Sequence, residues 1–227
     1  MPPPAGPWIP APFAPDTDLR IQALGSLIHA HPTQVIPLLK EIALDSRDPG
    51  EGRRAVFVLA QSRRPEARST VVEVAKEGPE PVRVAAVREL GRFGGADAGP
   101  ELLQVYSLAT PRVKREVVSS LAALGTGPTT DALLRIAKTE ADPQVRNIAI
   151  VTLGRTAGAT QLRALYDRTP PESRRAVLAA LFAARDEEGL MRIASTEGDA
   201  TLRREARRQL RLLGTPRALA YLNQHEK

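Results

Sequence analysis

The sequence predicts an all-α solenoid of about seven helical hairpins, roughly fourteen helices, and three observations support this prediction. A leucine at the end of a helix-spaced apolar stripe, which we call the marker leucine, returns every 28 to 32 residues: Leu27, Leu59, Leu90, Leu121, Leu153, Leu181 and Leu210. The same residue types stand at fixed distances before each marker. Aromatic residues make up only 4% of the chain, so the core must consist of small aliphatic side chains, which suit close helix stacking.

Residues 142–154, DPQVRNIAIVTLG, show the repeated unit most clearly. Asp142 is a typical N-cap residue, and Pro143 suits the first helical position because its missing N–H would have no partner there. One apolar stripe at helical spacing follows, formed by Val145, Ile148, Ala149 and Leu153. Gly154 permits close packing or a helix end. A helix with this stripe needs neighbours to bury it.

Three further columns accompany the marker leucines. Four positions before each marker stands a small or β-branched residue: Ala23, Ala55, Ala86, Val117, Ala149, Val177 and Ala206. Seven positions before it stands a basic residue, except in the second repeat, which has Gly52: Arg20, Arg83, Lys114, Arg146, Arg174 and Arg203. Four positions earlier still stands a capping residue: Asp16, Asp48, Thr110, Asp142 and Asp199. Pro79 and Pro170 occupy that place in the two other repeats, where we expect neighbours such as Thr169 to cap.

We interpret the basic column, together with Asp142 and Asp199, as a structural ladder. In such a ladder the cations pair with Asp side chains or backbone carbonyls between repeats. The regular spacing favours this interpretation over direct contact with a ligand.

The patterned helix of each repeat, which we call the B helix, is expected to follow a partner, the A helix. The first B helix is predicted over residues 18–30, and His31-Pro32-Thr33 breaks the chain after it. The next A helix has an apolar stripe at Ile36, Leu39, Ile42 and Ala43. Pro37 is expected in its first turn, where a proline is tolerated. The remaining B helices are predicted over residues 50–62, 81–93, 111–124, 142–155, 171–184 and 199–213. The remaining A helices are predicted over residues 65–76, 100–108, 129–139, 160–167, 187–195 and 216–224.

The pattern D-P-x-V-R-x-x-A-x-x-x-L-G resembles the HEAT-like repeat of the phycobilisome-lyase type, and the resemblance covers residues 16–227. It implies a right-handed superhelix of antiparallel helix pairs, in which the capping Asp and the following Arg form a ladder between repeats. We therefore expect a single HEAT-like solenoid over residues 16–227. The family shares a scaffold rather than a chemistry, so function does not come with the fold.

Residues 1–15 carry seven prolines, which predicts a disordered tail or linker. Trp8 and Phe13 in this tail form a short docking motif, are disordered, or fold onto the first helix. No run approaches the eighteen or so apolar residues of a membrane span, so we expect no membrane partner. A cytoplasmic location is the default expectation, and export stays open because such a tail can remain after removal of an export signal.

The sequence contains no convincing catalytic set. It has no cysteine, which excludes thiolate metal sites and thiol nucleophiles, and its histidines, His29, His31 and His225, are scattered. HEAT-like proteins that hydroxylate deoxyhypusine carry several His-Glu pairs, whereas this chain has only His225-Glu226. The acid pairs, such as Glu140 with Asp142, lie at helix starts or turns, where capping accounts for them. We therefore expect no enzyme activity, no metal and no cofactor.

The functional prediction concerns surface residues. B-helix residues off the apolar stripe are expected to line a concave groove, as in other stacked repeat proteins. Arginine and aromatic side chains there are typical of protein-binding surfaces, and the candidates are Arg53, Phe57, Arg88, Arg92, Arg115, Arg155 and Arg175. The net charge of +6 permits an acidic partner, although the arginine excess also fits a GC-rich genome. These observations predict a monomeric, non-catalytic scaffold that binds a protein or peptide partner.

Two alternatives remain open. A nucleic-acid binder that resembles the HEAT-like alkylpurine DNA glycosylases would fit the positive charge, but such enzymes place aromatic residues in the groove and the only Trp here is Trp8. A bilin lyase or isomerase is suggested by the repeat type alone.

The last B helix is rich in arginine, which indicates either a solvated capping face or a contact for anions: Arg203, Arg204, Arg207, Arg208 and Arg211.

Overall fold

The computed structural model describes residues 15–45, 47–125 and 127–225, and contacts divide the chain into two compact units. Unit 1 is Met1–Gly94 and unit 2 is Gly95–Lys227. The described ranges contain fourteen α-helices and no strand, which confirms the predicted all-α fold class. The single solenoid over residues 16–227 stays a prediction, and the proline-rich segment with Trp8 and Phe13 lies outside the described residues.

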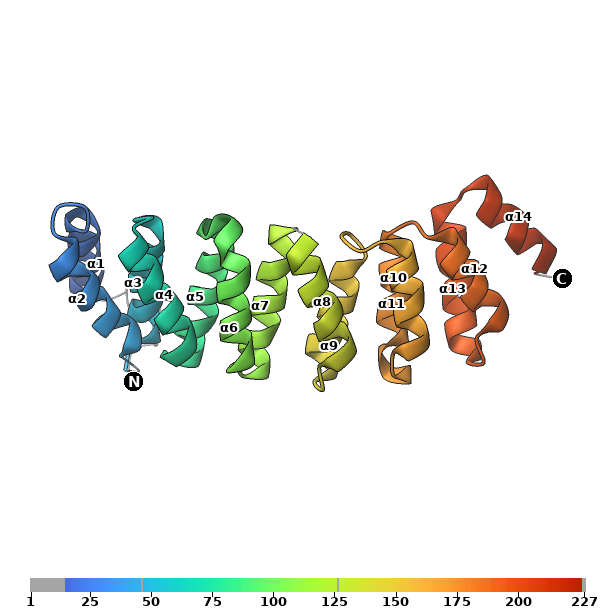
Figure 1. Cartoon of the computed structure of the whole chain (residues 1–227), viewed down its shortest axis with the longest axis horizontal. Helices are drawn as coiled ribbons and strands as arrows, with labels where there is room; N and C mark the ends of the chain where they lie inside the picture. Colours follow the sequence, from blue (N-terminus) through green and yellow to red (C-terminus); the bar gives the residue numbers. More distant parts are fainter. Residues whose placement is uncertain (1–14, 46, 126, 226–227) are drawn as a thin grey trace, which may run out of the picture. The chain divides into compact units, whose positions relative to one another are not determined.

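Unit 1 consists of two A helices that alternate with three B helices (Figure 1). The B helices are α1 (Pro15–Leu27), α3 (Pro49–Gln61) and α5 (Glu80–Phe93), and the A helices are α2 (Pro32–Leu44) and α4 (Pro65–Glu77). The B helices pack in a row, α1 against α3 and α3 against α5, while α2 packs against α4. Each A helix also packs against the B helix that follows it, so every hairpin lies against the next one.

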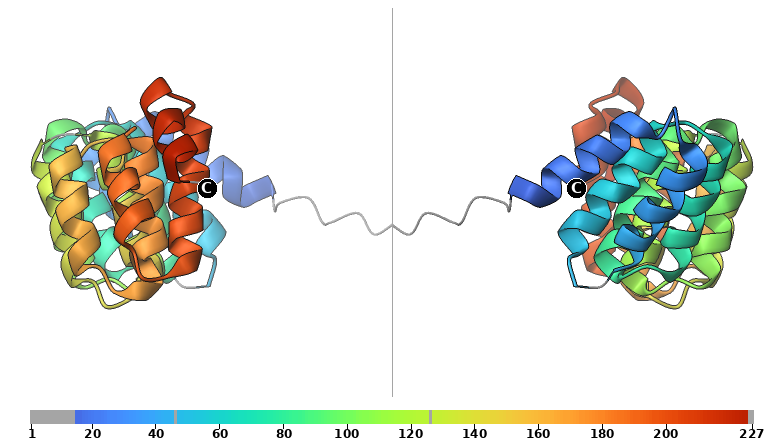
Figure 2. Two further views of the ribbon diagram at one scale, coloured as in Figure 1. Left: turned by 90° about the vertical axis from the view of Figure 1, so that its right-hand side faces the viewer. Right: turned by 90° about the vertical axis from the view of Figure 1, so that its left-hand side faces the viewer.

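Unit 2 begins with a short 3-10 helix and repeats the same arrangement. Its A helices are α6 (Ala98–Ser107), α8 (Gly127–Thr139), α10 (Ala159–Arg168), α12 (Glu187–Thr196) and α14 (Pro216–His225). Its B helices are α7 (Pro111–Leu124), α9 (Pro143–Leu153), α11 (Pro171–Ala183) and α13 (Ala200–Leu213). The B helices again form a row from α7 to α13, in which each packs against the next. At the C-terminal end of the row α13 lies beside α12 and also contacts α14 (Figure 2, left). Such a succession of stacked hairpins is an α-solenoid.

The core is the predicted apolar stripe, with one correction in α1. The marker leucines from the second repeat onwards are at most 3% exposed: Leu59, Leu90, Leu121, Leu153, Leu181 and Leu210. Leu27, in contrast, is 46% exposed, and the next residue, Ile28, is buried. Ile21 is buried seven residues before Ile28, so the stripe of α1 lies one residue later than predicted. The prediction of Leu27 and Ala23 as core residues was therefore wrong.

Aspartate caps begin several B helices. Asp48 accepts hydrogen bonds from the N–H groups of Gly50 and Glu51 at 2.8 and 3.0 Å. Asp142 and Asp199 cap α9 and α13 in the same way. These contacts satisfy N–H groups that have no partner within the helix.

Three other predicted starts differ from this pattern. Asp16 lies inside α1, which begins at Pro15, and Thr110 makes no side-chain capping bond to α7. Thr169 does not cap α11, because its hydroxyl donates to the carbonyl of Leu165 at 2.7 Å. A threonine hydroxyl can bond backward to the preceding turn, and this choice is not visible in the sequence.

Pro37 is the second correction to the predicted helices. It lies in the interior of α2, because that helix already begins at Pro32, which occupies its first turn. Pro37 is exposed, so the carbonyl that loses its partner there can be hydrated. None of the helices in the described ranges is long and apolar enough to cross a membrane.

Two glycines mark places where helices approach closely. A Cβ atom on Gly52 would lie 2.9 Å from the Val82 side chain and 3.2 Å from the Ala43 carbonyl oxygen. This contact explains why the second repeat lacks a basic residue at that position. A Cβ atom on Gly154 would lie 2.7 Å from the Ala180 carbonyl oxygen, so Gly154 lets the end of α9 pack closely on α11.

Candidate partner-binding surface and pocket

In unit 1 the predicted surface residues form two exposed rows. Arg53 and Phe57 lie one helical turn apart on α3, and Arg88 and Arg92 lie one turn apart on the neighbouring helix α5. Phe57 is 39% exposed, and the three arginines are exposed as well. The Arg92 guanidinium lies 5.4 Å from the centroid of the Phe93 ring. We call Arg53, Phe57, Arg88 and Arg92 the B-face of unit 1.

The candidates in unit 2 differ in their surroundings. Arg115 on α7 is half-buried and donates to the side-chain oxygen of Gln144 at 2.7 Å, so it joins successive B helices. Arg155 is exposed, but it lies after the last residue of α9 and is therefore not part of a B helix. Arg175 is exposed on α11, and its charge contributes to a lowered pKa of Glu205, for which the hydrogen bond from Arg208 is the main cause. Arg155 and Arg175 are therefore surface residues, whereas Arg115 also has a structural contact.

The residues of the basic column lie in the B helices, and several of their side chains reach the end of the preceding A helix or the turn after it. Arg146 is only 7% exposed, and it donates to the Ser173 hydroxyl at 2.9 Å, the Glu140 carbonyl at 3.0 Å and the Glu172 carboxylate at 2.8 Å. Arg83 donates to the Ala75 carbonyl at 3.1 Å, and Arg203 donates to the Glu197 carbonyl at 2.6 Å. Arg20 is exposed at the start of the row.

The two aspartates of the predicted ladder have a different role from the cations. Asp142 and Asp199 accept from the N–H groups of their own helices. The carboxylates that meet the cations Lys114 and Arg174 belong instead to Glu140 and Glu197.

Glu140 is the centre of a cluster that the sequence did not reveal. It accepts the Tyr106 hydroxyl, the Lys114 ammonium at 2.9 Å and the N–H of Asp142 at 3.0 Å. The Lys114 ammonium also lies 5.0 Å from the centroid of the Tyr106 ring, within cation–π range. The cluster joins α6, α7 and the turn before α9, so it ties successive repeats together.

The same cluster recurs two repeats later around Glu197. This carboxylate accepts the Tyr166 hydroxyl, Arg174 at 3.3 Å and the N–H of Asp199 at 3.1 Å. The Arg174 guanidinium lies 5.5 Å from the centroid of the Tyr166 ring. A shared Glu-x-Asp sequence before the two B helices is the only local signal for these clusters.

The clusters shift the pKa values of their members. Burial of Glu140 opposes its ionisation, but the Tyr106 hydroxyl, the Asp142 N–H and Lys114 outweigh it and lower its pKa to about 2. Burial and the hydrogen bond to Glu140 raise the pKa of Tyr106. The pKa of Glu197 is lowered, chiefly by the hydrogen bond from Tyr166. Both glutamates are therefore charged members of the fold at neutral pH.

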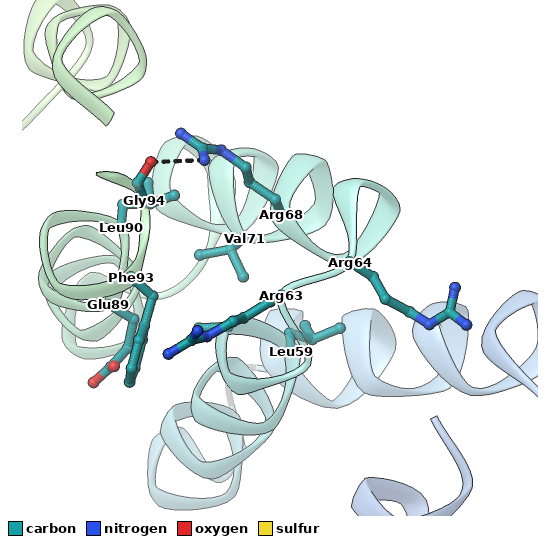
Figure 3. Close-up of a pocket in the computed structure, with 10 residues that line it drawn as sticks. Leu59, Arg63, Arg64, Arg68, Val71, Glu89, Leu90, Phe93 and Gly94 are labelled. Atoms are coloured by element: carbon teal, nitrogen blue, oxygen red, sulfur yellow. Dashed lines mark hydrogen bonds between the residues drawn. The ribbon is translucent and has the colours of Figure 1, made fainter. Parts of the chain in front are cut away.

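A pocket of about 150 Å³ lies where the C-terminal ends of α3 and α5 meet the start of α4 (Figure 3). Its lining combines apolar and charged residues: Leu59, Ala60, Arg63, Arg64, Arg68, Val71, Glu89, Leu90, Phe93 and Gly94. Arg68 donates to the Gly94 carbonyl at 2.8 Å and so stabilises the end of α5. Arg63 extends towards Phe93 and Glu89, while Arg64 points away from them (Figure 3).

Arg63 has an unusual backbone conformation. Its φ of 54° lies in the left-handed region, which glycine adopts without steric cost. Glycines with a left-handed backbone follow three other B helices, α5, α7 and α13: Gly95, Gly125 and Gly214, with φ of 59°, 61° and 64°. After α11 the same place is taken by Arg185, with φ of 55°. The marker columns did not include this position, so the sequence analysis did not single out either arginine.

The histidines do not form a site. His29, His31 and His225 are exposed, and His225 stacks on Tyr221 with ring centroids 4.3 Å apart. The described ranges contain no group of three or more His, Cys, Asp or Glu side chains arranged to hold a metal ion.

The arginine-rich B helix α13 has both paired and exposed cations: the Arg208 guanidinium pairs with Glu205 at 2.6 Å, and Arg204 is exposed.

The stacked hairpins with their B-face and turn contacts define a helical repeat protein of the α-solenoid class. A family profile of HEAT repeats matches residues 36–108 and 69–154, which together span more than half of the sequence. The chain therefore belongs to the HEAT-repeat family, as the D-P-x-V-R pattern predicted.

Several solved structures resemble the chain, among them two that cover most of its length. One is the complex of CpcE and CpcF of phycocyanin lyase from Nostoc sp. PCC7120, with 17% sequence identity, a TM-score of 0.42, and coverage of 97% of this chain and 98% of that chain. The other is human deoxyhypusine hydroxylase in complex with glycerol, with 17% identity, a TM-score of 0.38, and coverage of 88% of this chain and 92% of that chain. A comparison with curated proteins found no match.

The ladder interpretation predicts that Arg146→Ala lowers the free energy of unfolding by about 2–4 kcal/mol, because it removes a buried cation from three acceptors. Chemical denaturation monitored by circular dichroism measures this change. Arg155→Ala is the matched control and should change stability by at most about 0.5 kcal/mol, since Arg155 is exposed. Equal stability of Arg146→Ala and the wild type would refute the ladder role.

The Glu140 cluster predicts a pH-dependent contribution to stability. The pKa of Glu140 is about 2 in the folded chain and about 4.3 in an unfolded chain, so its contribution is present above the unfolded value and is lost as pH falls towards 2. Glu140→Gln should therefore lower stability by about 1–3 kcal/mol at pH 7, and the difference should shrink between about pH 4.5 and pH 2. Urea denaturation across this range tests it, and a difference that is independent of pH contradicts the assignment.

Proposed function

We propose that the chain is a non-catalytic scaffold that binds a protein or peptide partner through exposed faces of its B helices. The observation that carries this proposal is the B-face of unit 1, where Phe57 is 39% exposed beside exposed arginines. Phe57 lies one helical turn from Arg53 on α3, and Arg88 and Arg92 lie on the neighbouring helix α5. The B-face therefore places an aromatic ring among arginines, a composition that is typical of protein interfaces.

The chemistry of the B-face supports a protein partner. Aromatic residues and arginine are enriched at protein interfaces, and Phe57 with Arg53, Arg88 and Arg92 provides both. Arg53 and Arg92 are the probes of a partner, because both are exposed and they lie on the two neighbouring B helices of the B-face. The net charge of +6 favours association with an acidic surface. In unit 2 Arg175 is an exposed B-helix arginine that extends the same chemistry.

The arrangement of the charged groups supports a structural rather than a catalytic role for them. The acids and bases with strongly shifted pKa values in the Tyr106–Glu140 and Tyr166–Glu197 clusters bond to helix turns and to one another. Their shifts are accounted for by contacts that hold repeats together. Chain contacts therefore explain these groups without a substrate.

The test is a quantitative affinity capture with the purified chain, two variants of the B-face and one control variant. Arg53→Glu with Arg92→Glu reverses two exposed charges, and Phe57→Ala removes the aromatic anchor. The control reverses two exposed arginines on A helices of unit 2, Arg135→Glu with Arg168→Glu, so that the net charge changes equally. We expect a protein partner, identified by mass spectrometry, that both B-face variants lose about tenfold or more and the control retains.

Nuclease treatment and a salt series separate the two partner classes in the same experiment. Capture that survives nuclease and depends on Phe57 supports a protein partner. Capture that disappears with nuclease, together with steeply salt-dependent binding of duplex DNA by the purified chain, would replace the scaffold proposal with a nucleic-acid-binding function. Equal loss in the B-face and control variants would show that only net charge matters.

A further inference from the structure

The pocket of unit 1 has an apolar base that fits one aliphatic side chain. Leu59, Val71 and Leu90 are at most 3% exposed, and Phe93 forms a wall beside them. A single water needs about 10–15 Å³ of such space, so about 150 Å³ accommodates a group of several non-hydrogen atoms. The base offers no polar partner to a ligand, which favours a branched aliphatic group such as a leucine side chain.

The polar groups at the pocket combine a donor and an acceptor. Arg63 extends towards Phe93 and Glu89 (Figure 3). The Oε2 atom of Glu89 is buried and accepts no hydrogen bond from the described residues. A buried carboxylate oxygen without a donor is costly, and burial raises the pKa of Glu89 despite the opposing charges of Arg92 and Arg88. A ligand that supplies an N–H to Glu89 and an oxygen to Arg63 would satisfy both groups, and a peptide unit supplies both.

The backbone of Arg63 is the second, independent indication. Gly95, Gly125 and Gly214 show that glycine serves this left-handed position elsewhere in the chain. An arginine there carries a steric cost that glycine avoids, and such costs concentrate where a side chain is needed for a ligand. The Arg63 side chain lines the pocket and extends towards Phe93 and Glu89 (Figure 3).

We propose that this pocket binds one aliphatic side chain of an acidic partner segment, with Arg63 donating to a backbone carbonyl and Glu89 accepting a backbone N–H. This proposal rests on the proposed function and names the partner's chemistry. The acidic character follows from the lining, in which Arg63 and Arg68 stand against the single acid Glu89. The site lies at one edge of α3 and α5, next to the B-face but made of different residues.

The test is a titration of the isotope-labelled full chain with a synthetic peptide that has one leucine between pairs of aspartates. Two control peptides replace the leucine with serine or the aspartates with lysines. NMR chemical shifts of backbone amides locate weak binding. We expect shifts at Phe93 and Gly94 with the leucine peptide, and affinities at least about tenfold lower for both controls.

Arg63→Gly is the decisive variant because glycine fits the same backbone conformation. This variant should have a higher melting temperature than the wild type, and its affinity for the leucine peptide should be about tenfold lower. Arg185→Gly is the matched control, since it makes the same change at the corresponding left-handed position of unit 2. It should raise the melting temperature without any loss of affinity. Glu89→Gln retains the shape of the side chain and one acceptor oxygen, and it should also lower the affinity for the leucine peptide.

The outcomes separate this proposal from the proposed function. Unchanged affinity in Arg63→Gly, or equal binding of the serine peptide, would overturn the pocket assignment. If Arg53→Glu with Arg92→Glu abolishes peptide binding while Arg63→Gly does not, the scaffold function stands and the pocket fails. If none of the peptides shifts any amide at millimolar concentration, the pocket proposal fails, and affinity capture then decides the scaffold function alone.

Discussion

The structure depends on the burial of one aliphatic stripe between successive B helices. Leu59 in unit 1, and Leu153 and Leu181 in unit 2, are fully buried on B helices that pack against the next B helix of the same unit. Burial of such a side chain contributes about 1.5–3 kcal/mol, which no single hairpin can obtain alone. Small residues keep the helices close, and at Gly154 even a methyl group would collide with the neighbouring backbone.

Polar contacts are confined to the ends of these helices. Arg146 reaches two side chains and a carbonyl at the turns, and Glu140 and Glu197 each join a tyrosine, a cation and a backbone N–H. These groups provide hydrogen-bond partners for the backbone atoms of the turns, which the aliphatic side chains of the stripe cannot provide. The exposed faces of α3 and α5 are thereby left outside the structural contacts of the turns, which is why we place the proposed function there.

Local patterns predicted the helices and several of their caps, but not the choices that depend on three-dimensional neighbours. Leu27 and Ile28 are adjacent and both apolar, so a helical period fits either, and only the packing of α1 decides which is buried. Tyr106 and Glu140 stand 34 residues apart, and stacking of hairpins brings them together. The role of Arg63 depends on its left-handed backbone conformation, which the pattern of apolar residues does not predict.

Hydrogen exchange followed by mass spectrometry tests the central claim, that each hairpin is stabilised by its neighbours, most directly. Exchange of native amides reports the free energy of local opening. Helices covered on both sides, such as α9 and α11, should exchange slowest, whereas α1 and α14, which have fewer partners, should exchange fastest. Equal exchange rates in α14 and α9 would contradict the claim that nearest-neighbour burial holds this protein together.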